Sequence, residues 1–339
     1  MGVNLGKMTA RHDGHQRQLA QAKPGKHLFS MLLVVAFGVA VAIIIFSSIR
    51  EIALQRAEER FLQNAREFAS VLSRELQHED EELHKLKSIF SIHPDLRRPE
   101  FNKYTDQILE YQPALRAIGW HPRVAQSEID SFERAAQDEG LQGYRVRYSQ
   151  QFDPIKTPLD ITGQYPLLYI APYEQNKNFT GFDLISDPRW EPMIELATQS
   201  SHSIVSERIQ FGAEDVYGFF LIIAVYNTEL QDQIASPESR EHIRGILTGA
   251  YNINRLFEEV LGPFSDVATL YLFDTTTPDE ERILYVSDDA LFANLDKTST
   301  QETLNSANDD SLNYRQDFSF GGRTWTLVAQ PTELSLIHI

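Results

Sequence analysis

A run of 22 uncharged residues near the N-terminus constrains this chain more than any other feature of its sequence. Residues 28–49 read LFSMLLVVAFGVAVAIIIFSSI. As a helix at about 1.5 Å per residue the run is about 33 Å long, which matches the roughly 30 Å hydrocarbon core of a bilayer. A signal peptide has a shorter apolar stretch and a small-residue cleavage site, and a buried core helix is seldom so long. We therefore predict an uncleaved transmembrane helix at residues 28–49.

The charges on either side of this run predict its orientation. Residues 1–27 carry a net charge of +4, from five Lys and Arg side chains against Asp13. The positive-inside rule places such a tail in the cytoplasm. The whole chain has a formal charge of −17, so +4 for the tail leaves −21 for the rest. We therefore expect residues 1–27 to be a cytoplasmic tail and residues 50–339 to lie on the other side of the membrane, in the periplasm or exterior.

Composition and motifs remove several classes of function. With 48 Asp and Glu against 31 Lys and Arg, the chain lacks the basic surface that nucleic-acid binding requires. Cysteine is absent, which excludes disulfides, thiolate nucleophiles and cysteine-ligated metals. No common nucleotide-binding, hydrolase or zinc-protease motif occurs, and His78 and His84 are spaced for different faces of a helix. We predict no catalytic residue, metal or cofactor; a membrane-anchored hydrolase or transferase and a structural envelope-interaction module remain the alternatives.

Residues 50–92 predict a long stalk helix. They contain no proline or glycine, and apolar residues recur every three or four positions, with Glu79 filling one position of the stripe. Pro94 ends the pattern. A helix of this length, about 65 Å, with a narrow apolar stripe is typical of a stalk that packs on a partner helix. We expect a homodimer through the stalk, with packing within one chain as the alternative.

The rest of the chain predicts an α+β fold in which helices are followed by antiparallel strands, twice over. The segment 246–251 would open the second half, and Gly321-Gly322 would turn a hairpin near the end. The expected strands of the first half are 117–124, 144–148, 165–172, 203–209 and 218–226, and those of the second are 246–251, 269–274, 283–286, 318–320 and 325–328.

One carboxylate stands out in an apolar region. Asp183 follows Gly181-Phe182 and precedes Leu184-Ile185. Burying it is costly unless it accepts hydrogen bonds. Two interpretations stay open: a helix cap or backbone clamp, or an acceptor on the floor of an apolar pocket that orients a small ligand.

Several short motifs together resemble the CHASE family of extracytoplasmic sensor domains over residues 95–332. The resemblance implies two PAS-like antiparallel-sheet subdomains after the stalk. The first, at residues 93–230, would be membrane-distal and hold the ligand, and the second, at 242–332, membrane-proximal. It also implies a second transmembrane helix and a cytoplasmic histidine kinase or cyclic-di-GMP enzyme, so residues 333–339 would be a truncated or artefactual tail. The motifs are Trp120-His121-Pro122-Arg123-Val124, the 165–173 strand, Gly181-Phe182-Asp183-x-x-Ser186, the 218–226 strand and Gly321-Gly322-Arg323-x-Trp325.

The resemblance also implies a ligand site. Asp183 matches the aspartate that hydrogen-bonds the purine ring in plant cytokinin receptors, and Leu221 matches a strand residue whose backbone contacts that ligand. The sequence has Ile222-Ile223-Ala224 where those receptors have a Thr-Phe-Pro run. We therefore expect a ligand pocket at the same place in this chain, but not cytokinin as its ligand. We expect an unknown small-molecule ligand and no nucleic acid as partner. The candidate pocket walls are Phe182, Tyr169, Tyr173 and Phe219.

Overall fold

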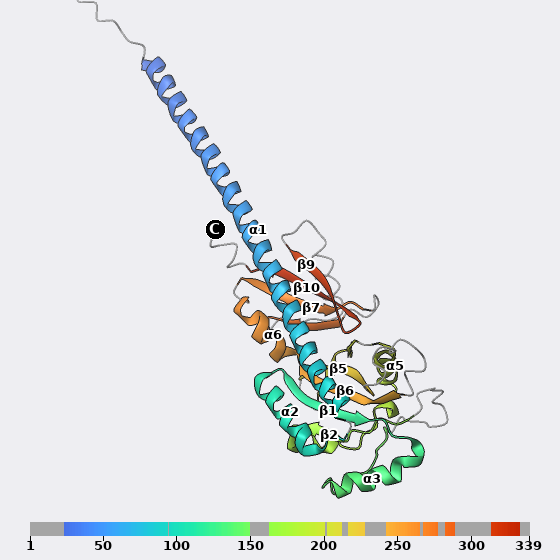
Figure 1. Ribbon diagram of the computed structural model, residues 1–339. Helices are drawn as coiled ribbons and strands as arrows, with labels where there is room; N and C mark the ends of the chain where they lie inside the picture. Colours follow the sequence, from blue (N-terminus) through green and yellow to red (C-terminus); the bar gives the residue numbers. More distant parts are fainter. Residues whose placement is uncertain are drawn as a thin grey trace, which may run out of the picture. The chain divides into compact units, whose positions relative to one another are not determined.

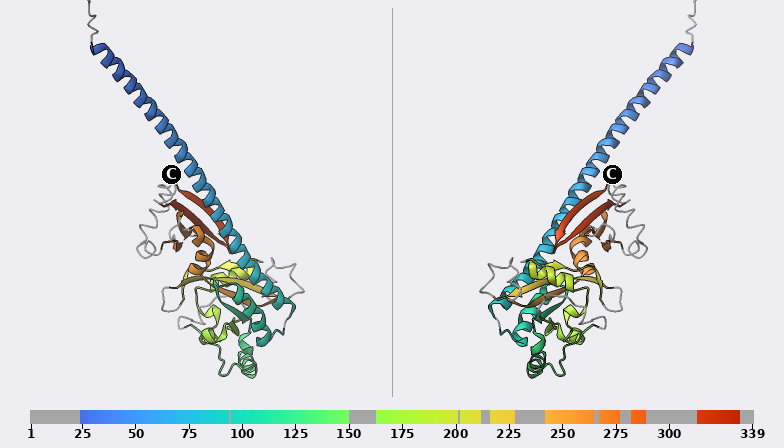
Figure 2. Two further views of the ribbon diagram at one scale, coloured as in Figure 1. Left: turned by 90° about the vertical axis from the view of Figure 1, so that its left-hand side faces the viewer. Right: turned by 90° about the vertical axis from the view of Figure 1, so that its right-hand side faces the viewer.

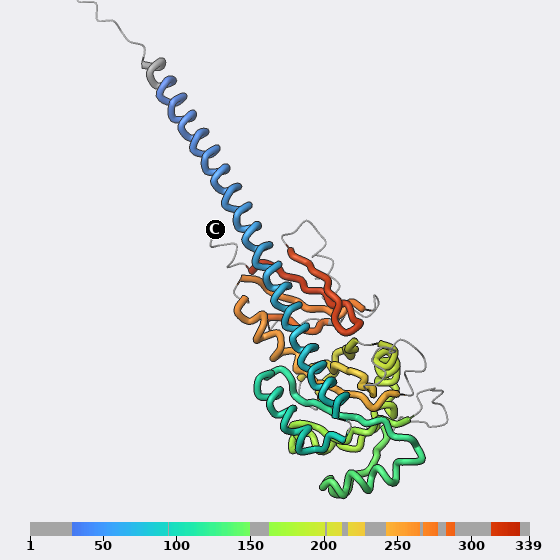
Figure 3. Tube along the Cα trace, in the orientation of Figure 1, coloured from blue at the N-terminus to red at the C-terminus, as the bar shows by residue number. Residues whose placement is uncertain are grey.

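A computed structural model describes residues 24–93, 95–149, 163–200, 202–211, 216–227, 242–264, 267–276, 282–288 and 313–332. Figure 3 traces the path of the chain. Most of the predicted cytoplasmic tail and the whole of 333–339 lie outside the described residues. The chain divides into two compact units, Met1–Arg56 and Ala57–Ile339, which are described separately.

The first unit contains the beginning of helix α1, which runs from Pro24 to Ile92. Among the described residues, one helix is long enough and apolar enough to cross a membrane, and it is α1. Its apolar side chains in this unit are exposed, for example Phe29 at 68% and Phe46 at 69%, as a segment surrounded by lipid requires. The long apolar N-terminal helix of the prediction is confirmed as a candidate membrane span.

The second unit contains two antiparallel sheets, so the predicted α+β class is confirmed (Figure 1). One sheet has six strands in the order β2-β1-β6-β5-β3, with β4 also pairing with β5, and the other has four in the order β8-β7-β10-β9. The strands are β1 Leu115–Pro122, β2 Tyr169–Ala171, β3 Ile204–Val205, β4 Ile209–Gln210, β5 Tyr217–Tyr226, β6 Ile243–Asn252, β7 Ala268–Asp274, β8 Arg282–Val286, β9 Tyr314–Phe320 and β10 Arg323–Pro331.

Helices lie between and beside these strands. The α-helices after α1 are α2 Arg98–Tyr111, α3 Ile129–Asp138, α4 Tyr173–Asn176, α5 Glu191–Gln199 and α6 Ile253–Leu261. Single 3-10 turns are η1 Gln126–Glu128, η2 Lys177–Phe179, η3 Leu184–Ser186 and η6 Gly262–Phe264. Helix α6 leads from β6 in the first sheet to β7 in the second, and it begins where the Asn252 side chain accepts a hydrogen bond from the Arg255 backbone N–H.

The structure corrects the prediction that residues 246–251 open the second half. Strand β6 lies in the middle of the six-stranded sheet, where Leu247 pairs with Trp120 of β1 and Gly249 with Leu221 of β5. All residues from Gly245 to Tyr251 are buried, since a central strand is covered on both faces. The change of sheet therefore comes after Asn252. Of the predicted strand 144–148, the structure retains a bridge between Arg147 and Phe182.

The apolar stripe of α1 packs on both sheets of its own chain. Phe68 contacts Phe264 beside the four-stranded sheet, with ring centroids 4.0 Å apart, and Phe90 contacts Trp120 of the six-stranded sheet at 4.3 Å. Figures 1 and 2 show α1 running past the two sheets in this order. The stripe is buried within one chain, so it is not free to form the predicted dimer contact. Its buried members are Phe61, Ala65, Phe68, Leu72, Leu76, Leu83, Leu86 and Phe90.

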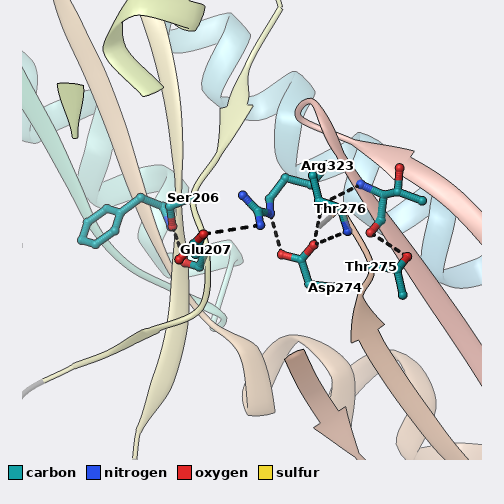
Figure 4. A network of polar contacts seen from close by, with 8 residues as sticks. Ser206, Glu207, Asp274, Thr275, Thr276 and Arg323 are labelled. Carbon is teal, nitrogen blue, oxygen red and sulfur yellow. Dashed lines mark hydrogen bonds and ion pairs between the residues drawn. The ribbon is translucent and has the colours of Figure 1, made fainter. Parts of the chain in front are cut away.

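The β9–β10 turn joins the two sheets. Val205 of β3 donates its backbone N–H to the Gly321 carbonyl at 2.8 Å. Gly321 has φ +53°, and a Cβ there would lie 2.3 Å from Val205 Cγ2, so both conformation and contact require glycine. Next to the turn, Arg323 Nε donates to Asp274 Oδ2 at 2.5 Å and the guanidinium approaches Glu207 at 4.0 Å (Figure 4).

The buried carboxyl of Glu79 makes the stability of this unit depend on pH. Glu79 lies in the α1 stripe, where its Oε2 has no hydrogen-bond partner in the described ranges, and the Tyr251 hydroxyl donates to its backbone carbonyl at 3.4 Å. Burial, with the negative charges of Glu75, Glu259 and Glu82, raises the Glu79 pKa to about 8. A group with a raised folded-state pKa stabilises the fold below its ordinary pKa, and that stability is lost as pH rises to the folded value.

We therefore expect the free energy of unfolding to fall between pH 5 and pH 8, and Glu79→Gln to remove about 1.4 kcal/mol per pH unit from that slope. Urea denaturation of the full chain in detergent at pH 5, 7 and 9 measures it. The control is Glu81→Gln, which changes an exposed carboxyl of the same helix and should leave the slope unchanged. Equal slopes in wild type and Glu79→Gln would contradict the prediction.

Candidate functional site

Asp183 lies in a loop that the backbone holds tightly. Gly181 before it has φ +85°, and a Cβ there would meet the Arg145 carbonyl oxygen at 1.9 Å. The Asp183 N–H donates to the Arg147 carbonyl at 2.9 Å, and the Asp183 carbonyl accepts from Ser186 Oγ at 2.6 Å. These bonds fix where the Asp183 side chain points.

The Asp183 carboxyl itself is fully buried and only half used. Its Oδ1 accepts a hydrogen bond from the Tyr165 backbone N–H at 2.8 Å, while Oδ2 has no hydrogen-bond partner among the described residues. At the start of η3 it makes no side-chain cap. One oxygen therefore clamps the backbone, and the other is a buried acceptor without a donor, which is costly unless something supplies one.

The surroundings of Asp183 favour its neutral form more than water does. Burial raises its pKa to about 6, and the nearby amides of Tyr165 and Ile185 limit the rise. Two tyrosine hydroxyls close by are already engaged: Tyr144 donates to the Leu167 carbonyl at 3.2 Å and Tyr148 to Gln164 Oε1 at 3.0 Å. At pH 7 the carboxyl is mostly ionised and its free oxygen is suited to an N–H or cationic donor.

A buried histidine that the sequence interpretation left without a role connects this loop to the six-stranded sheet. His121 Nδ1 lies 3.3 Å from the Tyr165 carbonyl and its Nε2 lies 3.2 Å from Thr248 Oγ1. Burial lowers the His121 pKa to about 3, so the ring is neutral. Gly119 of β1 pairs with Thr248 of β6, and a Cβ at Gly119 would lie only 2.6 Å from Thr248 Oγ1. His121 and Thr248 thus help to position Tyr165, whose backbone N–H binds Asp183.

The other predicted site residues are divided between the two faces of this sheet. Phe219 and Leu221 belong to the core on the α1 face, where Phe219 stacks on Tyr251 at 5.3 Å. Tyr169 belongs to the same core, and its hydroxyl donates to Glu139 Oε2 at 2.6 Å. Asp183 adjoins the opposite face, since its neighbour Leu184 packs with Ile222, Ala224 and Tyr226. Alternation along the strands separates the two groups of side chains.

Phe182 and Tyr173 lie nearer to the Asp183 loop. Phe182 is partly buried and bridges to Arg147. Tyr173 lines an open cavity of about 230 Å³ between the segment after α3 and the α4–η2 segment. The cavity is lined by Leu141, Gln142, Gly143, Tyr144, Arg145, Arg147, Tyr173, Lys177, Asn178 and Thr180.

Within the described ranges, no three His, Asp or Glu side chains are grouped to hold a metal ion. His84 lies 3.2 Å from Ser203 Oγ and 3.7 Å from Asp80 through the same nitrogen, Nε2. A hydrolytic relay needs the carboxylate and the hydroxyl on different ring nitrogens. This trio is therefore a polar contact between α1 and the loop before β3.

The ionised Asp183 should cost the fold stability that asparagine does not. Its folded pKa is above its ordinary value, so wild type loses stability as pH rises from 4 through 6. We expect the difference in unfolding free energy, Asp183→Asn minus wild type, to grow by about 2–3 kcal/mol between pH 4 and pH 7 in urea titrations.

Asp187 supplies a control of opposite sign. Arg189 binds it, with Nη2 2.6 Å from Oδ2, and lowers its pKa. Asp187→Asn should therefore lose stability at pH 7 and approach wild type in acid. Parallel pH profiles for the Asp183 and Asp187 variants would show that Asp183 is not held as described.

Known proteins resemble this chain in sequence and in fold. The sequence is 22% identical over 198 residues to histidine kinase 3 of Arabidopsis thaliana, an alignment that covers 55% of this chain and 18% of that protein. The chain thus spans about a fifth of the length of that relative.

Two solved structures with similar folds are chemoreceptor ligand-binding domains. That of the Pseudomonas aeruginosa amino acid chemoreceptor PctC, in complex with GABA, has 12% identity and a TM-score of 0.47, covering 80% of this chain and 98% of that one. That of Pseudomonas fluorescens CtaA, in complex with L-alanine, has 10% identity and a TM-score of 0.47, covering 82% and 99%.

The family model of the CHASE domain matches residues 94–285. That range is more than half of the chain and takes in every strand of the six-stranded sheet together with β7 and most of β8. The chain therefore belongs to the CHASE domain family, and it is an extracytoplasmic ligand-sensing module of a receptor.

Proposed function

We propose that the ligand is a small molecule with an N–H or cationic group that binds Asp183. The observation that carries this is the fully buried Asp183 carboxyl, whose Oδ2 has no donor among the described residues. A ligand donor would satisfy that oxygen and recover the cost of its burial. The matching aspartate of plant cytokinin receptors supports the role, while Ile222-Ile223-Ala224 argues for a ligand other than cytokinin.

The membrane arrangement is part of the proposal. Residues 28–49 span the bacterial inner membrane, the N-terminus is cytoplasmic and residues 50–339 are periplasmic. Along α1, Phe68 contacts Phe264 of η6, beside the four-stranded sheet, and Phe90 contacts Trp120 of the six-stranded sheet. In sequence, Phe68 is closer than Phe90 to residues 28–49, which supports a membrane-proximal role for the four-stranded sheet and a membrane-distal, ligand-holding role for the six-stranded sheet.

The signal would reach a cytoplasmic histidine kinase or cyclic-di-GMP enzyme through α1 and a second transmembrane helix. Only a ligand with different affinities for two arrangements of the domain can drive such a change. A homodimer would use the outer, polar side of the stalk, because the apolar stripe is buried in the chain's own core.

A ligand screen tests the role of Asp183. The full chain in detergent is heated with purines, amino acids and small carboxylates, and a bound compound raises the melting temperature by mass action, about 2.7 kcal/mol of stability at one hundred times its Kd. We expect at least one donor-bearing compound to bind, more tightly at pH 7 than at pH 5 because Asp183 ionises in between. Asp183→Asn should weaken binding tenfold or more, and Asp187→Asn should not. A compound that binds both variants alike would remove Asp183 from the site.

Reporter fusions test the membrane arrangement. Alkaline phosphatase fused after Thr332 should be active in cells, since it folds only when exported, and green fluorescent protein at the same point should be dark. Replacing Lys7, Arg11, Arg17, Lys23 and Lys26 by Gln should weaken this orientation. A fluorescent fusion with inactive phosphatase would place residues 50–332 in the cytoplasm.

A further inference from the structure

Arg147 is a fixed guanidinium without an anionic partner in the described part of the chain. Its Nε donates to the Thr180 carbonyl at 3.1 Å, and its Nη2 donates to the Thr180 and Asn178 carbonyls at 2.6 and 2.5 Å. These acceptors are neutral, so they orient the side chain and leave its charge uncompensated. These bonds use the Nε and Nη2 hydrogens, and the two N–H groups of Nη1 remain to donate to a carboxylate or phosphate oxygen.

The cavity beside Arg147 is positive although the chain as a whole carries −17. Its lining includes Arg145, Arg147 and Lys177 and no carboxylate. Arg145 forms an ion pair with Glu133, and Lys177 forms one with Glu174; neither glutamate lines the cavity. Arg147 is therefore the lining cation whose charge is not balanced by a carboxylate of the described residues.

The cavity also has an aromatic wall, and a cation of a neighbouring element lies over that ring. The ring of Tyr173 lines it, and the guanidinium of Arg98 from α2 lies 3.9 Å from the centroid of that ring. A cation over an aromatic ring is held in place by the ring's negative face. A fourth cation is thus fixed next to the cavity, on a neighbouring element.

The cavity and Asp183 are built on the same pair of segments. The Arg147 N–H donates to the Gly181 carbonyl at 2.7 Å, and the Asp183 N–H donates to the Arg147 carbonyl at 2.9 Å. The Arg147 side chain lines the open cavity. Phe182 is the bridge partner of Arg147, and the next residue, Asp183, has a buried side chain. The two side chains are therefore held by backbone hydrogen bonds between the same two segments, although the Asp183 side chain is not part of the cavity lining.

We propose that this cavity is an oxyanion subsite of the ligand site, in which a carboxylate or phosphate of the ligand pairs with Arg147 and Lys177 beside the Tyr173 ring. The proposal rests on the proposed function, because it assumes that the donor end of the same ligand binds Asp183. It narrows the ligand class to small molecules that carry both an oxyanion and an N–H or cationic group.

The test uses the full chain in detergent and three probes at constant ionic strength: succinate, inorganic phosphate and the uncharged succinamide. We expect succinate or phosphate to raise the melting temperature with a saturable dependence on concentration and succinamide to have no effect. Saturation by one anion and not by the other separates a carboxylate subsite from a phosphate subsite.

Two variants and one control assign the effect to the cavity. Arg147→Met should weaken anion binding at least tenfold, and Lys177→Gln, at an exposed side chain whose loss the fold tolerates, should weaken it severalfold. The control is Arg134→Met, on the exposed side of α3, which should bind the anions as wild type does. Equal responses of all variants would indicate a general salt effect and overturn the subsite, as would the absence of any saturable shift in wild type.

The outcome separates this proposal from the sensor role of Asp183. A screened compound that loses affinity in Asp183→Asn and keeps it in Arg147→Met would overturn the oxyanion subsite and leave the Asp183 site standing. A compound that depends on Arg147 and is indifferent to Asp183→Asn would support the subsite and contradict the role given to Asp183.

Discussion

The second unit depends on one helix face that serves as core for two sheets. The apolar stripe of α1 from Ala57 onward packs on the four-stranded sheet near Phe68 and on the six-stranded sheet near Phe90. Neither sheet alone covers the stripe, and both sheets contribute residues to the core cluster that contains it. Because closely packed interiors respond as a unit, a displacement of the six-stranded sheet by a ligand has a direct route into the helix that leads to the candidate membrane span.

A second route connects the sheets to each other. The Gly321 carbonyl accepts the Val205 N–H, while Val205 also pairs with Leu221 of β5. On the other side of the same turn, Arg323 is bound to the buried Asp274 (Figure 4). The edge strand β3 thus lies between the central strands of one sheet and the hairpin of the other. Coupling of the two sheets needs no flexible connection, since ordinary backbone bonds provide it.

Sequence patterns predicted where helices and strands lie in the chain better than they predicted which other elements these pack against. The period of the α1 stripe and the hairpin at Gly321-Gly322 follow from local rules, and both are present. The prediction that residues 246–251 open a second sheet was wrong, because it relied on sequence order. The pairing of β6 with β1 and β5 depends on tertiary contacts that sequence order does not reveal. The stripe of α1 suggested a partner helix for the same reason: a pattern indicates which face is buried and not what buries it.

The candidate site shows the same division between local and tertiary information. Asp183 was identifiable as a carboxylate in an apolar stretch, and its burial is a direct consequence. Phe219 and Tyr169 were predicted to line the pocket because they are aromatic. Side chains alternate between the two faces of a strand, so position along the strand decides the face. Both residues lie on the face that packs against α1. Arg147 gave no signal, since its alternating segment resembles any exposed strand; only the carbonyls of Asn178 and Thr180 distinguish it.

Two of the buried carboxyls of this unit, Glu79 and Asp183, differ in the charge that they carry at neutral pH. Glu79, with a pKa near 8, is neutral at pH 7 and is tolerated in the core of the stalk as a polar group. Asp183, with a pKa near 6, keeps its charge at the same pH although burial opposes it. A fold that needed Asp183 only as a clamp for the Tyr165 N–H could use an uncharged acceptor such as asparagine at lower cost. A retained charge with a free oxygen is what recognition of a donor requires, and it lies one residue along the chain from Phe182, which bridges to the cation Arg147.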